Sequence, residues 1–113
     1  PLAFVMGIPA DECTSFGRLL GEKVFVTELI AFGTLGEWIG SGESPLSSRS
    51  AQIAAYALCG FANVPSIGIQ IGGIAALAPS RRGDLASLGL RAMIAGALAS
   101  WCTACIASMF IGS

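Results

Sequence analysis

The sequence contains no histidine and few charged residues, and both absences narrow what the protein can be. Of its 113 residues, 12% are charged and 54% are hydrophobic. A typical soluble domain carries about 25% charged residues. This composition, with a mean hydropathy of +0.76, predicts a membrane protein. The lack of histidine removes histidine-based catalysis, most zinc sites and histidine pH switches. The net charge of −1 gives no reason to expect a nucleic-acid partner, because such proteins are usually basic.

Two further absences concern targeting and metal binding. No basic segment with a cleavage site follows Pro1, so we predict no signal peptide. Cys102 and Cys105 have the spacing of a redox or metal pair, but no second pair and no histidine accompany them. We interpret them as small apolar residues in helix packing, and we expect neither a metal site nor a cofactor. The apolar segments are too few to enclose a solute path, so residues 1–113 are interpreted as a fragment of a longer membrane protein.

The apolar segments predict an all-α membrane fold. Residues 85–111 form the clearest span, because Arg91 is their only charge and about 20 apolar residues cross a bilayer core. Residues 50–77 form a second span that polar residues interrupt near its centre. Arg81 and Arg82 lie between the two spans and indicate the cytoplasmic side. The last span then leads outward, so the C-terminus is predicted to be extracellular.

Residues 9–39 predict a re-entrant helical hairpin. A helix starts near Pro9 and runs to about Leu20, residues 21–23 interrupt it, and a second apolar run extends to Ile39. Each arm has about 10 to 15 residues, which is too short to span a bilayer comfortably. The competing interpretation is a single tilted span over residues 16–39.

The interruption at the centre of residues 50–77 is the best candidate for a binding site. Pro65 lacks an N–H and frees the carbonyl of Phe61, so a new half-helix can start near Ser66. Asn63 and Ser66 offer donors and acceptors suited to a neutral, hydroxyl-rich solute. Phe61 could line a solute pocket or simply pack against neighbours. The alternative for the whole segment is a proline kink in which Asn63 bonds to a neighbouring helix.

Glu28 is the one acidic residue well inside an apolar stretch. An ionisable residue at membrane depth costs roughly 3 kcal/mol on insertion scales, so it is a functional candidate by default. Its carboxylate can accept hydrogen bonds from two adjacent hydroxyls, as on a ribose. The alternative is that Glu28 pairs with Lys23 and only neutralises the hairpin tip.

These residues lie in segments that resemble a known family. GEKVFVTELIA, residues 21–31, resembles the G-x-K-x-x-x-N-E-F-V-A signature of concentrative nucleoside transporters. YALCGFAN, residues 56–63, followed by SIGI, resembles the broken-helix motif of that family. PLAFVMGIP at the start of the chain and APSRR, residues 78–82, match two further stretches. The family has an asparagine where this sequence has Thr27, so coupling or affinity is expected to differ there.

The resemblance implies the C-terminal part of a homotrimeric, sodium-coupled nucleoside symporter, a plasma-membrane solute carrier with nucleosides, Na⁺ and the lipid bilayer as partners. It places Glu28, Asn63 and Ser66 against the ribose, with Phe61 beside the ligand. The main Na⁺ site belongs to an earlier part of such a carrier. The alternative function is a non-transporting membrane subunit with a structural kink. An intramembrane enzyme using Glu28 lacks a nucleophile–base pair, so we predict that the protein is not an enzyme.

Overall fold

The computed structural model describes residues 1–112, and helices joined by short loops are the only regular elements in that range. The elements, in chain order, are α1 (Leu2–Val5), α2 (Cys13–Phe25), α3 (Glu28–Ser41), α4 (Ser48–Leu58), α5 (Val64–Leu77), a 3₁₀ turn (Pro79–Arg81) and α6 (Arg82–Phe110). The molecule is elongated, with extents of 51 × 27 × 20 Å.

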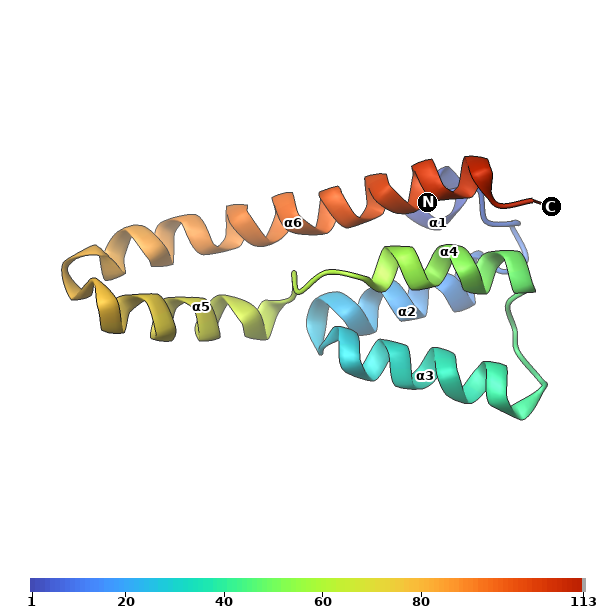
Figure 1. Cartoon of the computed structure of the whole chain (residues 1–113), viewed down its shortest axis with the longest axis horizontal. Coiled ribbons are helices and arrows are strands. Elements are labelled where there is room, and N and C mark those ends of the chain that lie inside the picture. The colour runs from blue at the N-terminus through green and yellow to red at the C-terminus, as the bar shows by residue number, and fades with distance from the viewer. Residues whose placement is uncertain (113) are drawn as a thin grey trace.

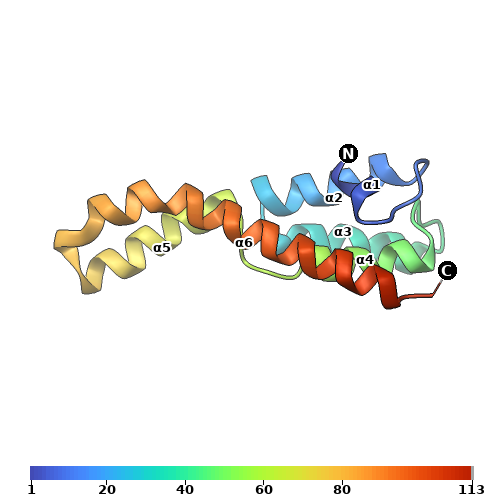
Figure 2. The same ribbon diagram turned by 90° about the horizontal axis from the view of Figure 1, so that it is seen from above.

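The helices form two regions along the long axis of the molecule. α1 to α4 gather beside the C-terminal half of α6, while α5 and the first half of α6 run side by side away from them (Figures 1 and 2). The hydrophobic core lies entirely in the first region, and its largest fully buried apolar side chains are Phe16, Met6, Ile8, Leu19, Ile53 and Leu58. Only Ser66 is buried along α5.

The helices α2 and α3 lie side by side and meet near the middle of the long axis (Figure 1). The first arm starts at Cys13 and not near Pro9, and the chain breaks between the arms at Val26 and Thr27 and not at residues 21–23, so both expected positions are too early in the sequence. α2 continues to Phe25 because Lys23 is fully buried and held by two hydrogen bonds. Thr27 then starts α3 as its N-cap, accepting a hydrogen bond from the amide of Ile30 at 3.3 Å. A single helix over residues 16–39 is therefore wrong.

The segment between α4 and α5 is non-helical from Cys59 to Asn63. Gly60 has φ +122°, a conformation that side chains with a Cβ rarely adopt, and it lies close to Ser100 of α6. Pro65 sits in the first turn of α5, where its missing N–H removes no helical hydrogen bond. The polar break therefore separates two half-helices of 11 and 14 residues.

The last helix is the longest in the described part of the chain. With the preceding 3₁₀ turn it covers Pro79–Phe110, and it is long and apolar enough to cross a membrane by length and composition. The loop before α4 and the C-terminal end of α6 lie at the same end of the molecule, and the α5–α6 connection lies at the other (Figure 1).

Candidate functional site

Asn63 is the N-cap of α5 and makes a reciprocal capping box with Ser66. The Asn63 Oδ1 atom accepts a hydrogen bond from the Ser66 amide at 2.8 Å, and the Asn63 amide donates to Ser66 Oγ at 3.2 Å. The Ser66 hydroxyl also donates to the Asn63 carbonyl at 2.7 Å. Two of the helix's first amides are thus satisfied by side chains. The sequence therefore starts a new helix at mid-segment through Asn63 and Ser66, with Pro65 between them.

Asn63 also forms a hydrogen bond with a residue at the connection between α2 and α3. Its Nδ2 atom donates a hydrogen bond of 2.6 Å to Oε2 of Glu28, the first residue of α3. Both side chains are buried, with exposed fractions of 0% for Asn63 and 7% for Glu28. A carboxylate is favoured at a helix start, where the helix dipole is positive. The starts of α3 and α5, 35 residues apart in sequence, are joined by this one hydrogen bond.

Three of the four predicted site residues are therefore brought together. Glu28, Asn63 and Ser66 form one continuous hydrogen-bonded cluster. The cluster keeps free capacity, because no hydrogen bond in the described part of the chain uses Oε1 of Glu28 or the second N–H of Asn63. One acceptor and one donor side by side match the needs of a pair of solute hydroxyls.

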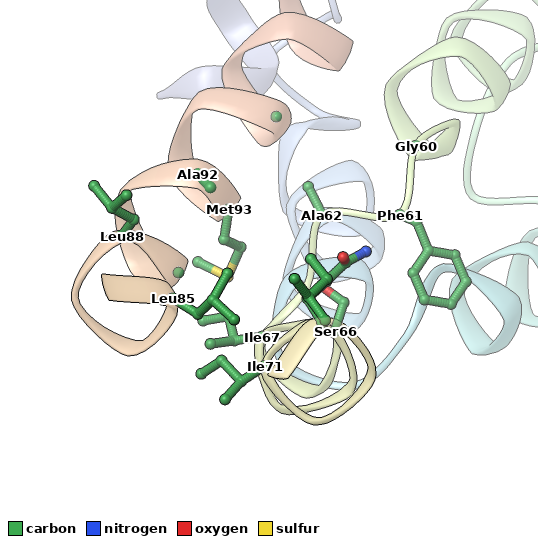
Figure 3. A pocket seen from close by; sticks show the side chains of 14 residues that line it. Gly60, Phe61, Ala62, Ser66, Ile67, Ile71, Leu85, Leu88, Ala92 and Met93 are labelled. Carbon is green, nitrogen blue, oxygen red and sulfur yellow. The ribbon is translucent and has the colours of Figure 1, made fainter. Parts of the chain in front are cut away.

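Phe61 lies apart from that cluster, and 61% of its surface is exposed. In Figure 3 its ring points away from the side chains of α6. An apolar groove of about 440 Å³ opens between α5 and α6, and Ser66, Ile67, Ile71 and Leu85 line it together with Phe61 and others. The side chains of Ile67 and Ile71 on α5 point toward Leu85 on α6 (Figure 3).

Lys23 does not pair with Glu28, the partner considered for it from the sequence. The ion pairs in residues 1–112 are Arg18–Glu22 and Arg81–Asp84. Its Nζ atom donates to the carbonyl of Ala57 at 2.8 Å and to Ser100 Oγ at 2.6 Å. Sequence analysis missed Ala57 and Ser100. No local pattern marks them, because the three residues meet only when α2, α4 and α6 pack.

Discontinuous helices whose ends meet at polar groups are typical of one class of proteins, the secondary transporters. These proteins bind their solutes at such helix ends. Residues 1–108 match the family model described as "Na+ dependent nucleoside transporter C-terminus". The chain belongs to this family of Na⁺-dependent nucleoside transporters and corresponds to its C-terminal part. The family consists of transporters and not enzymes, which agrees with the prediction from sequence.

Individual relatives support the same assignment. The chain is 48% identical to "Solute carrier family 28 member 3" of Eptatretus stoutii, over 96% of this chain and 18% of that protein. It is 45% identical to "Uncharacterized transporter YutK" of Bacillus subtilis, over 98% of this chain and 26% of that protein. The chain thus spans about a fifth to a quarter of the length of these relatives.

The fold is similar to that of a solved transporter. The structure of CNTnw in an inward-facing, substrate-bound state matches with a TM-score of 0.92 and 38% sequence identity, covering 98% of this chain and 27% of that one. An intermediate state of a CNTnw variant matches with a TM-score of 0.93 and 40% identity, over 99% and 27% of the two chains.

Proposed function

We propose that the full-length protein containing this segment is a sodium-coupled nucleoside symporter, and that the segment supplies the ribose-binding part of its site. The hydrogen bond between Glu28 and Asn63 carries the proposal. It holds an unused carboxylate oxygen and an unused amide N–H next to each other at two helix starts. The names of the family and of its relatives support the substrate class and the coupling ion.

In this proposal each predicted residue has a distinct role. Glu28 accepts a hydrogen bond from one ribose hydroxyl, and Asn63 donates to or orients the other. Ser66 fixes Asn63 through the capping box and borders the solute. Phe61, exposed at the break, packs beside the ligand. The main Na⁺ site lies in the earlier part of the full-length chain.

The wider arrangement is also part of the proposal. The α2–α3 pair enters the bilayer from the outer side and returns, α4 and α5 cross it as one broken helix, and α6 crosses it once more. The C-terminus then lies outside the plasma membrane and the arginines before α6 lie inside. The carrier is proposed to be a homotrimer.

The ribose assignment is tested by measuring uptake of nucleosides that lack one ribose hydroxyl, both in the unmodified protein and in Glu28→Gln. In the full-length protein, uptake of uridine is compared with uptake of its 2′-deoxy and 3′-deoxy analogues, in Na⁺ and in choline. A hydrogen bond to a charged group contributes about 1.5–3 kcal/mol. The deoxy analogue that lacks the contact is therefore expected to lose about 10- to 100-fold in uptake efficiency. Glu28→Gln is expected to lower uridine uptake by a similar factor and to abolish most of that discrimination.

Glu37→Gln is the matched control, because Glu37 lies on the same helix and is exposed. It is expected to preserve both uptake and discrimination. Undiminished discrimination in Glu28→Gln, with the protein present at the surface, contradicts the ribose role. Absence of Na⁺-dependent uptake by the unmodified full-length protein contradicts the symporter function itself. It favours the structural kink, in which the bond of Asn63 to Glu28 of the neighbouring helix only holds the two helices together.

A further inference from the structure

Lys23 is the only lysine of the chain and is fully buried, yet no carboxylate pairs with it in the described residues. Lysine is almost never fully buried without a partner. Its Nζ atom instead contacts two uncharged oxygens, the Ala57 carbonyl at 2.8 Å and Ser100 Oγ at 2.6 Å. These oxygens must therefore stabilise the ammonium group.

The break after α4 makes the first of these oxygens available. The helix ends at Leu58, so the carbonyl of Ala57 has no amide four residues later to accept from. Ala57 is fully buried, so water does not reach it within this segment. The Ser100 hydroxyl donates its hydrogen to the Ala97 carbonyl at 2.9 Å, which leaves its lone pairs for Lys23. The C-terminal end of a helix also favours a positive charge.

A helix C-terminal end with free carbonyl oxygens is the type of site at which broken helices of transporters hold Na⁺. Here the cation is part of the chain. We propose that Lys23 is a built-in cation that fills an Na⁺-type site at the end of α4. This half of the broken helix therefore keeps its geometry without taking up a coupling ion.

The site of Lys23 lies next to the two breaks that carry the cluster of Glu28, Asn63 and Ser66. Ala57 precedes the break and Asn63 follows it, while Lys23 and Glu28 lie on either side of the α2–α3 connection. Lys23 therefore links the end of α2 to the end of α4, before the two breaks. The bond between Glu28 and Asn63 links the start of α3 to the start of α5, after the two breaks. Lys23 is a positioning residue for the site, and that consequence rests on the proposed function. The cation site itself rests on the contacts alone.

The test compares two neutral substitutions in the purified full-length protein. Lys23→Ala leaves an open space lined by the two oxygens, whereas Lys23→Met fills the space with an uncharged chain of similar length. Thermal unfolding is followed in NaCl and in choline chloride at equal ionic strength. A ligand that binds only the folded state raises its stability by mass action. Lys23→Ala is therefore expected to gain on the order of 2 °C more from Na⁺ than Lys23→Met or the unmodified protein gains.

Equal responses of the two variants to Na⁺ overturn the proposal. Arg18→Ala, an exposed cation on the same helix, is the control and should respond to Na⁺ as the unmodified protein does. If Lys23→Ala does not fold, Ser100→Asp decides. A carboxylate beside a bound ammonium is expected to leave the protein folded, and loss of the folded protein overturns the proposal.

Uptake adds a readout that a purely structural lysine would not change. Lys23→Ala is expected to need a higher Na⁺ concentration for half-maximal nucleoside uptake, by about threefold or more, with a steeper Na⁺ dependence. Lys23→Met is expected to stay impaired at every Na⁺ concentration. An unchanged Na⁺ dependence in Lys23→Ala overturns the built-in cation. Absence of uptake by the unmodified protein overturns only the proposed function, because the thermal test does not depend on transport.

Discussion

The molecule has two regions that use the same apolar composition in different ways. The packed body comprises residues 1–58, which include α1 to α4, with residues 97–110 of α6, and the extended arm comprises α5 with residues 82–96 of α6. Every residue of the hydrophobic core lies in the packed body. In the arm, apolar side chains such as Ile69, Leu77 and Leu88 are exposed by 63%, 87% and 55%.

The difference raises the question of what covers the exposed apolar side chains of the arm. The chain spans about a fifth to a quarter of the length of its curated relatives, so in the proposed full-length carrier other segments are able to cover the arm. A helix that is apolar on all sides is typical of a membrane span or of the core of a large protein. The body buries a hydrophobic core within the segment, whereas the apolar surface of the arm needs an apolar environment that lies outside the segment.

The largest effect is expected from the core of the packed body. Phe16→Ala removes a fully buried ring and is expected to cost about 3–5 kcal/mol of unfolding free energy. Thermal unfolding of the purified full-length protein measures this. Phe110→Ala, at an 84% exposed position at the end of α6, is the control and should cost far less. Equal losses for the two variants would break the distinction between buried and exposed apolar residues.

The next effect concerns the junction of the two regions. Asn63→Ala removes the N-cap of α5 and leaves the buried Glu28 carboxylate without its donor. The combined cost is expected to be about 2–4 kcal/mol, with loss of most nucleoside uptake. Uptake and surface expression are measured together. Gln70→Ala, an exposed amide on the same helix, is the control, and a variant at Asn63 that transports as well as that control would refute the prediction.

A smaller effect is expected inside the arm. A Cβ at Gly89 would lie 2.9 Å from Cγ2 of Ile67, so in Gly89→Ala either the Ile67 side chain or the two helices must shift. Overpacking of this kind costs about 1–3 kcal/mol. Gly83→Ala, where no atom lies within 4 Å, is the control in the same thermal assay. A neutral result at Gly89 would mean that the arm adjusts freely, which would sharpen the contrast with the body.

The smallest effect is expected at the far end of the arm. Arg81 pairs with Asp84 at 2.6 Å, but both side chains are largely exposed. Exposed ion pairs contribute about 0–1 kcal/mol. Arg81→Gln should therefore leave the melting temperature within experimental error. A clear drop in melting temperature would show that another part of the full-length protein contacts this connection.

Much of this organisation was accessible from local sequence signals. The all-helical fold follows from long apolar runs, and the break at Asn63, Pro65 and Ser66 follows from proline and capping chemistry. The break between α2 and α3 was misplaced by a few residues, because Gly21, Glu22 and Lys23 look like a polar interruption. The local signal was outweighed by tertiary contacts that bury Lys23 inside α2.

By itself, the sequence determined the helical class, the family and the polar interruption at Asn63, Pro65 and Ser66, because composition, proline positions and motifs are local properties. Only the tertiary structure decided which of these residues meet. The contact of Glu28 with Asn63 joins positions 35 residues apart, and that of Lys23 with Ser100 joins positions 77 residues apart. Such pairings depend on how helices pack, and a buried polar group finds its partner only once that packing has excluded water.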